Sequence, residues 1–564
     1  MKRGWIFLCL LMLVLVAEAN PVDVKRAKAT AQKVLGGTDV HSVAMVQTGE
    51  TRRAADAAEP AYYVFVREEG AGFVIVSGDD ALPELVAYSD QTSFPSEGEI
   101  HPALSGFLDT YASMVEAVRN GEEVVTMSQR VDAAVPVVEP LCKTQWSQGN
   151  PYNALCPLDE GKRSMVGCVA LAMAQIMKYH EWPLHGTGKV SYTPSTVKEL
   201  QVVDFSQSTY QWKVMLNTTA ELKADAEAAE AVAKLCYDCG VSSRMEYGAE
   251  ESGTYDDYAI QSMYENFGYK ASTIQILYRD CFATQQEWNA IWKAELDAGR
   301  PILYSGLSKS GGHEFIIDGY DSNGFVHVNW GWGGDFDAFY DIAILDATPA
   351  MSFTDAQAMI VGIEPDYTGT DRVHAPVIPF MASSFSLSKS VTLNKDRLIN
   401  VKEIYNRSRS AQTWFFGVGL FDVEGNMLAN LTKNETSHSI PSMKGLTQTM
   451  VIFNIPSNTP DGEYVLSVIF RPKNSDEWLF PNVVGGAEKN RVYVKVHDGV
   501  ADVHDGTVPI YNICVDDEDS TTGEVVSHQY YDMMGRPLKN APKGLVLDVK
   551  TFSNGEKKAR KVLF

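Results

Sequence analysis

The sequence predicts an α+β protein of several domains, with a β-sandwich toward its C-terminus. Its 564 residues are more than a single hydrophobic core usually holds. The first two thirds of the chain mix helix-like and strand-like segments. After about residue 366, short alternating apolar runs recur between turn residues, which is typical of a sandwich. The hydrophobic content of 45% and the charged content of 21% are ordinary for a globular protein.

The N-terminus has the three parts of an export signal. Lys2 and Arg3 supply positive charge, the run from Ile6 to Val16 is apolar, and Ala17 to Ala19 offers small residues for cleavage. The run is shorter than the roughly 20 apolar residues of a membrane-spanning helix. We therefore predict a signal peptide over residues 1–19 and a mature protein that is secreted or attached to the outer surface.

Residues 20–131 are predicted to form a compact α+β unit. The stretch from Gly121 to Pro140 has little periodicity and is interpreted as a linker open to proteolysis. The elements expected in the unit are helices from Asp23 to Leu35 and Leu104 to Arg119, and a hairpin of Tyr62 to Arg67 with Gly72 to Ser77.

Three further units are predicted, over residues 132–365, 366–500 and 501–564. The first should contain helices Cys168 to Tyr179 and Ala220 to Asp238, and strands Ile302 to Tyr304, His313 to Asp318 and Phe325 to Trp330. The second is the sandwich, with strands expected at Thr413 to Phe421, Thr449 to Ile455, Tyr464 to Phe470 and Arg491 to Val496. The third is a small β-rich unit.

The charge balance argues against one class of function. Lys and Arg number 48 against 72 Asp and Glu, which gives a formal net charge of −24. Nucleic-acid binding needs a basic face that neutralises phosphates. We therefore expect no nucleic-acid partner.

Eight cysteines are present, and Cys9 leaves with the predicted signal peptide. An odd number remains, so at least one thiol lies outside any intramolecular disulfide. Whether Cys142 pairs with Cys156 is open from the sequence. Cys236 and Cys239 are either half of a zinc site or core residues of a helix, and the lack of a nearby histidine pair favours the core.

The segment MVGCVALAMAQIMKYH, from Met165 to His180, holds the first candidate catalytic residue. Gly167 precedes Cys168, and an apolar helix begins at the cysteine. The positive end of the helix dipole is expected to lower the pKa of this thiol, and the thiolate is the nucleophilic form. A buried structural cysteine would show the same local pattern.

His313 is the second candidate, at the start of a predicted strand. Gly312 precedes it and would let a substrate backbone approach closely. Asn329 follows in the motif HVNWGWGG, and its amide is expected to accept from one ring nitrogen of His313 and leave the other as the base. Trp330 would shield that bond from water. The alternative histidines are His180, His185 and His327, the last of which lies in the same motif.

Gln148 precedes Cys168 by a short loop. Its side-chain amide, together with the backbone N–H of Cys168, is a candidate oxyanion hole. The order Gln, Cys, His, Asn is that of papain-like proteases, in which His and Asn follow the cysteine by roughly 130–150 residues. His313 falls inside this interval, and Asn329 lies slightly beyond it.

Four motifs in this order resemble the streptopain-like branch of the papain clan of cysteine proteases. They are Ser147 to Asn153 (SQGNPYN), Gly167 to His180, Gly311 to Tyr320 (GGHEFIIDGY) and His327 to Gly334 (HVNWGWGG). The resemblance covers about residues 135–365 and implies a papain-like core of two subdomains. It further implies an endopeptidase that acts on protein substrates, requires no metal or other cofactor, and favours a hydrophobic substrate residue at the P2 position.

The same resemblance assigns the site. Cys168 is the nucleophile, His313 its partner, Gln148 the oxyanion residue and Gly312 a substrate-binding residue, with Asn329 and Trp330 behind the histidine.

Two positions depart from the family pattern. Glu314 stands where relatives tend to have a small residue, and strand alternation predicts that it faces away from Cys168. The loop from Ala249 to Thr254 is more acidic than the loop of streptopain. Glu314 either alters the pKa of the histidine or has no effect, and the acidic loop puts any transferred specificity in doubt.

The flanking units resemble known parts as well. Residues 20–131, with GFVIVSGDD from Gly72 to Asp80, look like the inhibitory propeptide of this family, which implies an intramolecular inhibitor that covers the cleft and displaces catalytic groups. The segment Tyr530 to Arg536 (YYDMMGR) and the basic end look like a type IX secretion sorting domain, as in Bacteroidetes. This resemblance implies a secretion machinery as a partner.

Two alternatives stand beside the zymogen of a cysteine endopeptidase. One is a catalytically silent surface-attached binding protein or adhesin, which the sandwich and the tail fit equally well. The intact set of candidate catalytic residues favours the enzyme. The other is a cysteine-dependent amidase of cell-wall peptides, which would not obviously need an inhibitory unit of this size.

Overall fold

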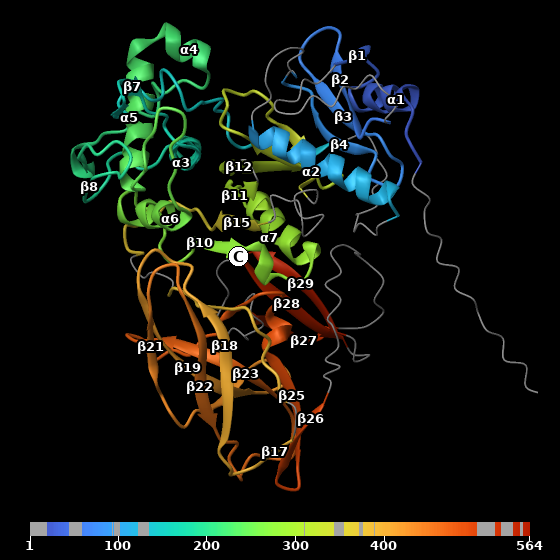
Figure 1. Ribbon diagram of the computed structural model, residues 1–564, viewed down its shortest axis with the longest axis vertical. Coiled ribbons are helices and arrows are strands. Elements are labelled where there is room, and N and C mark those ends of the chain that lie inside the picture. Colours follow the sequence, from blue (N-terminus) through green and yellow to red (C-terminus); the bar gives the residue numbers. More distant parts are fainter. Residues whose placement is uncertain are drawn as a thin grey trace, which may run out of the picture.

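A computed structural model shows how these units are arranged (Figure 1). The described residues are 20–43, 59–92, 94, 102–121, 135–308, 311–342, 355–371, 376–387, 390–504, 525–531, 545–552 and 557–563. The predicted signal peptide and most of the linker between residues 121 and 140 lie outside them. The part of the linker that is described includes a short strand, β5 (Pro136–Val138), which pairs with the end of the central-sheet strand β12 (Gly311–Asp321).

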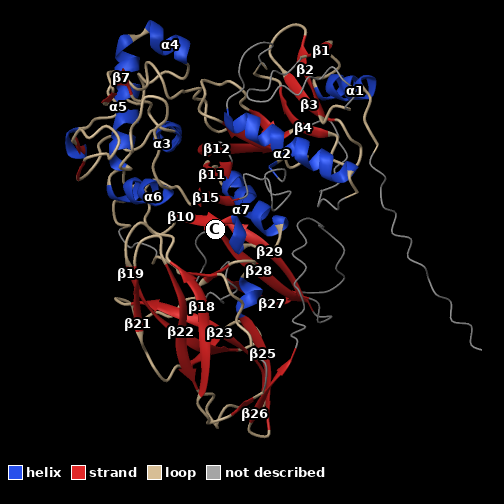
Figure 2. Cartoon of the chain, in the orientation of Figure 1, coloured by secondary structure: helices blue, strands red, loops and turns tan. Residues whose placement is uncertain are grey.

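A single sheet runs through the upper half of the molecule (Figure 2). Within the described residues its strand order is β1-β2-β3-β4-β14-β13-β12-β11-β15-β10. The strands are β1 Val40–Ser42, β2 Tyr62–Arg67, β3 Phe73–Ser77, β4 Leu85–Ser89, β10 Gln275–Tyr278, β11 Ile302–Ser308, β12 Gly311–Asp321, β13 Val326–Asn329, β14 Ala338–Tyr340 and β15 Asp355–Val361. The pairs along this order are antiparallel, and β12 lies near the middle.

Two groups of helices cover this sheet from opposite sides (Figure 1). The helices are α1 Val24–Val34, α2 Pro102–Arg119, α3 Cys168–His180, α4 Thr219–Ala224, α5 Ala226–Ser242, α6 Asp256–Glu265 and α7 Gln285–Asp297. Helices α2 and α7 share one apolar core with Phe315 on β12. Helices α3, α5 and α6 share a second core with Ile316, the next residue on the same strand. The alternation of β12 therefore separates the two cores.

The local elements agree with the sequence, and the predicted α+β class is confirmed. Helices α1, α2 and α3 and the hairpin β2–β3 lie where periodicity and turn residues placed them. The helix expected from Ala220 to Asp238 is instead two helices. Asp225 separates them, because its side chain accepts from the N–H of Ala228 and starts α5 anew.

The N-terminal unit, residues 20–121, is continuous with the central sheet. Strand β4 pairs with β14, with Tyr88 opposite Phe339. The hydroxyl of Tyr88 also donates to Asp321 at the end of β12, over 2.8 Å. Helix α2 crosses the same sheet, and its Phe107 packs edge-on against the ring of Tyr340. The compact α+β unit predicted from the sequence thus extends the sheet of the next unit.

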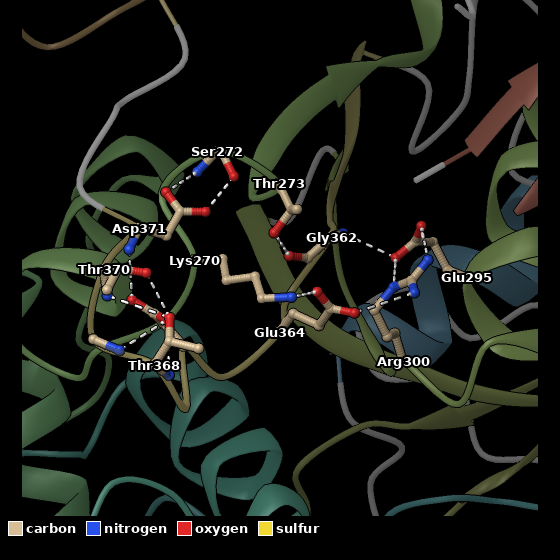
Figure 3. A network of polar contacts seen from close by, with 12 residues as sticks. Lys270, Ser272, Thr273, Glu295, Arg300, Gly362, Glu364, Thr368, Thr370 and Asp371 are labelled. Carbon is tan, nitrogen blue, oxygen red and sulfur yellow. Dashed lines mark hydrogen bonds and ion pairs between the residues drawn. The ribbon is translucent and has the colours of Figure 1, made fainter. Parts of the chain in front are cut away.

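A network of polar contacts, buried around Glu295 and more exposed at its rim, fastens the far edge of the sheet (Figure 3). Glu295 at the end of α7 accepts two hydrogen bonds from the guanidinium of Arg300, both of 2.8 Å. It also accepts from the N–H of Gly362 after β15, and Glu364 pairs with Lys270. Gly362 has φ +69°, and a Cβ there would meet the carbonyl of Thr273 at 2.1 Å, so only glycine fits.

The sandwich forms the lower part of the molecule (Figure 1). Its two sheets have the orders β22-β18-β16-β24 and β17-β26-β25-β23-β19-β20, with β21 beside β19. The strands are β16 Phe380–Met381, β17 Val391–Thr392, β18 Arg397–Tyr405, β19 Gln412–Phe421, β20 Met427–Asn430, β21 Ser437–Ile440, β22 Gly445–Phe453, β23 Gly462–Pro472, β24 Asn482–Val483, β25 Arg491–His497 and β26 Val500–His504. The sandwich thus extends slightly past residue 500.

The sandwich contacts the unit above it through an arginine. Arg407 makes two hydrogen bonds to the carboxylate of Asp280, of 3.1 and 2.5 Å. Its guanidinium also lies 4.1 Å from the ring centroid of Phe380. Arg409 lies over the ring of Tyr255, at the start of α6. These contacts hold the sandwich against the end of the sheet and against α6.

The last described strands are β27 Val525–Tyr531, β28 Leu545–Phe552 and β29 Lys557–Leu563, which form an antiparallel sheet of their own. The strand β29 lies beside α7. In the described part of the chain, no helix combines the length and the apolar character needed to cross a membrane.

The junction between β4 and β14 generates a first prediction. Tyr88→Phe removes the hydroxyl that donates to the buried carboxylate of Asp321, which should cost about 1–2 kcal/mol locally. We expect amide hydrogen exchange in β4 and β14 to speed up roughly tenfold. Tyr405→Phe, at a half-exposed tyrosine of the sandwich, is the control and should leave exchange unchanged. Unchanged exchange in Tyr88→Phe would show that this bond does not secure the junction.

Candidate functional site

Cys168 is the first residue of α3, as predicted. Gly167 precedes it with φ +89°, and a Cβ on Gly167 would meet the side chain of Met245 at 2.6 Å. A larger residue would therefore be strained both by its backbone and by its neighbour. The glycine turns the chain so that the cysteine starts the helix. Its thiol packs against the core that α3 shares with one face of β12.

The thiol of Cys168 is held in its neutral form. Burial raises its pKa to about 11. The N–H groups of Glu314 and Val169 favour the thiolate, while the negative charges of Glu314 and Asp256 oppose it. The pKa lowering expected from the helix dipole is therefore wrong for this conformation, because desolvation outweighs the dipole.

His313 lies on β12 with its ring among aromatic side chains. It stacks on Trp332 at 5.1 Å and on Trp330 at 6.1 Å between ring centroids. Its Nε2 donates to the carbonyl of Trp330 over 3.0 Å, which leaves Nδ1 unprotonated in the neutral ring. Burial lowers the pKa of His313 to about 4. The ring is thus neutral at pH 7, as a general base must be before it acts.

Asn329 ends β13, next to the strand that carries His313, but its amide bonds elsewhere. Its Oδ1 accepts from Gln175 of α3 over 3.2 Å and from the N–H of Gly331. Its Nδ2 donates to the carbonyl of Thr144 over 2.7 Å. The orienting bond to His313 stays a prediction, and here the carbonyl of Trp330 takes that place. Sequence reasoning missed Gln175, whose signal is a lone polar residue within an apolar helix.

Trp330 and Trp332 form a stacked pair beside the histidine. Their ring centroids are 4.9 Å apart and their planes differ by 7°. Trp330 is buried beside His313, while its role in shielding an Asn329–His313 bond stays a prediction. Trp332, which the sequence analysis did not assign, makes the closer stack on His313. The backbone N–H of Trp330 donates to Asp337, a carboxyl whose pKa burial raises to about 7.

The loop of Gln148 runs beside the segment that leads into α3. Its carbonyl accepts from the N–H of Val166 over 3.0 Å. Gly312 is exposed, next to His313, and pairs with Leu307 of β11. The loop of Gln148 thus adjoins the segment before Cys168, and Gly312 lies on the strand that contacts α3, while the roles of Gln148 and Gly312 stay predictions.

Glu314 does not face away from Cys168. Alternation along β12 points His313 toward the aromatic core and leaves Glu314 on the face that α3 covers. Its carboxyl lies close enough to raise the pKa of the Cys168 thiol. The expectation was wrong because the pattern gives the alternation but not which of the two residues meets α3.

The other histidines and cysteines have structural surroundings. His327 is buried against Asp318, with 2.6 Å between Nδ1 and Oδ1. Cys142 and Cys156 are free and buried, so they are not paired. The cysteines of α5 lie in its apolar core, as favoured from the sequence. The described residues contain no group of three or more His, Cys, Asp or Glu arranged to hold a metal ion.

A cysteine at the start of a buried helix, facing a strand with histidine and flanked by an Asn-Trp motif, is the arrangement of a cysteine peptidase. Comparison with known proteins agrees. Residues 146–340 match the peptidase C10 family, and residues 19–115 match the Spi protease inhibitor family.

The chain is 34% identical over 330 residues to streptopain of Streptococcus pyogenes, which covers 54% of this chain and 80% of streptopain. It is 29% identical to the thiol protease/hemagglutinin PrtT of Porphyromonas gingivalis, over 64% of this chain and 43% of PrtT. A prointerpain A fragment from Prevotella intermedia (mutant C154A) aligns with a TM-score of 0.49 at 31% identity, over 58% of this chain and 99% of the fragment.

The chain belongs to the peptidase C10 family, the streptopain-like group to which its motifs pointed. It is a cysteine-type peptidase with a papain-like core, and it carries an inhibitory propeptide. Its partners are therefore protein substrates and its own pro-domain.

The partly buried thiol of Cys168 generates a second prediction. A pKa of about 11 in place of 9.0 lowers the thiolate fraction at pH 7 about 100-fold. In the intact precursor we expect alkylation of Cys168 by iodoacetamide to be slow at pH 7 and to rise until about pH 11. Peptide mass spectrometry measures the labelling of this cysteine alone, and free cysteine in solution is the control. A plateau below pH 9 would contradict the burial argument.

Proposed function

We propose that the protein is a secreted cysteine endopeptidase that uses a Cys168–His313 dyad, with Gln148 in the oxyanion hole. The observation that carries the proposal is the position of Cys168 at the start of α3, beside the strand of His313. Gly312, exposed at the start of the same strand, would bind the substrate backbone.

The reaction follows from these groups. His313 takes the thiol proton, and the thiolate of Cys168 attacks the peptide carbonyl. The side chain of Gln148 and the N–H of Cys168 stabilise the negative oxygen that forms. His313 then protonates the leaving amine, and water hydrolyses the thioester. For this reaction the ring of His313 must give up its hydrogen bond to the carbonyl of Trp330 and turn toward Cys168 and Asn329.

Aromatic contacts explain how the N-terminal unit keeps the enzyme latent. Phe94 packs edge-on against Phe336 at 5.1 Å, and Phe336 packs against Trp332. Trp332 in turn stacks on His313. The N-terminal unit contributes Phe94 to this row of aromatic rings. Removal of the unit takes away that support and lets the side chain of His313 move.

The proposal includes the units of the chain. We propose that residues 1–19 direct export, that residues 20–131 are the removable inhibitor and that residues 132–365 form the mature peptidase. Residues 366–500 would be the sandwich, and residues 501–564 a sorting domain read by a secretion machinery. The export signal in the sequence and the separate sheet β27–β29 support these assignments.

The third prediction tests catalysis. Purified precursor and its Cys168→Ala variant are incubated with an unfolded protein under reducing conditions. We expect the wild type to shorten and to digest the substrate, and a thiol-directed epoxide to block both. Cys168→Ala should do neither. A wild type that stays inert after a protease has trimmed it near Arg130 would instead favour a binding protein.

The fourth prediction tests latency. Phe94→Ala removes a buried ring, which should weaken the hold of the N-terminal unit by about 3–5 kcal/mol. We expect conversion to the mature enzyme at least tenfold faster than in the wild type, followed by gel electrophoresis. Val24→Ala, at an exposed position of the same unit, is the control. A folded Phe94→Ala precursor that converts at the wild-type rate would exclude the aromatic row as the restraint.

A further inference from the structure

Glu314 is a buried acid whose partner is missing. Its side chain is 3% exposed, and both carboxylate oxygens are buried without a hydrogen-bond partner among the described residues. Burying a carboxyl group without a partner is costly, so such a group calls for a physical reason. The catalytic steps proposed above do not use it.

A second acid lies beside it. Ser305 is the cross-strand neighbour of Glu314 on β11, and its hydroxyl donates to Asp256 over 2.9 Å. Neighbouring side chains on one face of an antiparallel pair lie within about 5.5 Å at their Cβ atoms. The charge of Asp256 accordingly adds to the effect of burial in raising the pKa of Glu314.

Both acids adjoin the nucleophile. The backbone N–H of Glu314 reaches the sulfur of Cys168, and the charges of both acids act on its thiol. When Cys168 cleaves a peptide bond, the substrate residue next to that bond would therefore lie close to Glu314 and Asp256.

Arg409, a cation of this region, contacts residues other than the two acids. Arg409 of the sandwich lies over Tyr255 and opposes the charge of Asp257, the residue after Asp256. In the portions of the chain that are described, no lysine or arginine pairs with Glu314 or Asp256. The acids next to the thiol are thus left for a positive group from outside.

We propose that Glu314 and Asp256 form an acidic subsite that selects substrates with a lysine or arginine side chain next to the cleaved bond. The proposal rests on the proposed peptidase function and names its substrate class. It replaces the hydrophobic preference that the family resemblance implied. Cys168 is partly exposed in the precursor, and Glu314 lies on the face of β12 that α3 covers, so a substrate that reaches the thiol adjoins the carboxyl group.

The test compares two peptides that differ in one side chain. In each pair one peptide carries arginine and the other carries citrulline, its neutral isostere, at the same position. The positions on either side of the cleaved bond are tested one pair at a time. The enzyme is activated from the full-length precursor and its active sites are counted by titration with the epoxide. We expect wild type to cleave the best arginine peptide at least tenfold faster than its citrulline twin, measured as kcat/KM.

The variant Glu314→Gln keeps the shape and removes the acid, whose charged form a bound cation would favour. We expect the arginine-to-citrulline ratio to fall at least fivefold in it, and also in Asp256→Asn, with the control Glu230→Gln on the exposed face of α5 unchanged. The ratio is the readout because altered thiol reactivity changes both peptides alike. A ratio near one in wild type, a leucine peptide cleaved faster than the arginine peptide, or a ratio unaltered in Glu314→Gln would overturn the proposal. Failure of the epoxide to label Cys168 would instead overturn the peptidase function itself.

Discussion

The contact between the start of α3 and strand β12 determines the rest of the site. It brings the sulfur of Cys168 against the peptide that joins His313 to Glu314. Because the strand alternates, these two residues belong to different cores of the molecule. One core surrounds His313 with indole rings, and the other places Glu314 beside Cys168. A single register thus fixes both the reactive groups and their electrostatic surroundings.

The sheet makes inhibition and catalysis parts of one structure. Strand β4 of the N-terminal unit pairs with β14, and β14 pairs with β13, which ends at Asn329. Thr92 of the same unit donates to the carbonyl of Asp337, whose carboxyl accepts from Trp330. The inhibitor therefore touches the strands that orient the histidine, and not only the approach to the thiol. Its removal changes the edge of the catalytic sheet.

Local features of the site could be predicted from the sequence, and the long-range pairings could not. The start of α3 at Cys168 follows from a glycine and an apolar period, which are properties of neighbouring residues. The junction of Tyr88 with Asp321 joins segments far apart in the chain, so no local pattern contains it. The partner of Asn329 is Gln175, which a helical pattern marks only as polar. Whether Glu314 faces α3 depends on which of the two cores the aromatic residues on the opposite face of β12 fill. That is a property of the tertiary structure.

Burial favours the uncharged forms of both Cys168 and His313, which accounts for latency. The thiol of Cys168 has a pKa of about 11, and the ring of His313 one of about 4. Both shifts oppose a proton transfer from sulfur to nitrogen in this conformation, and their largest cause is desolvation. Water and a bound substrate can remove it without changing the fold. The enzyme can therefore stay folded and silent in the same sheet that later carries its chemistry.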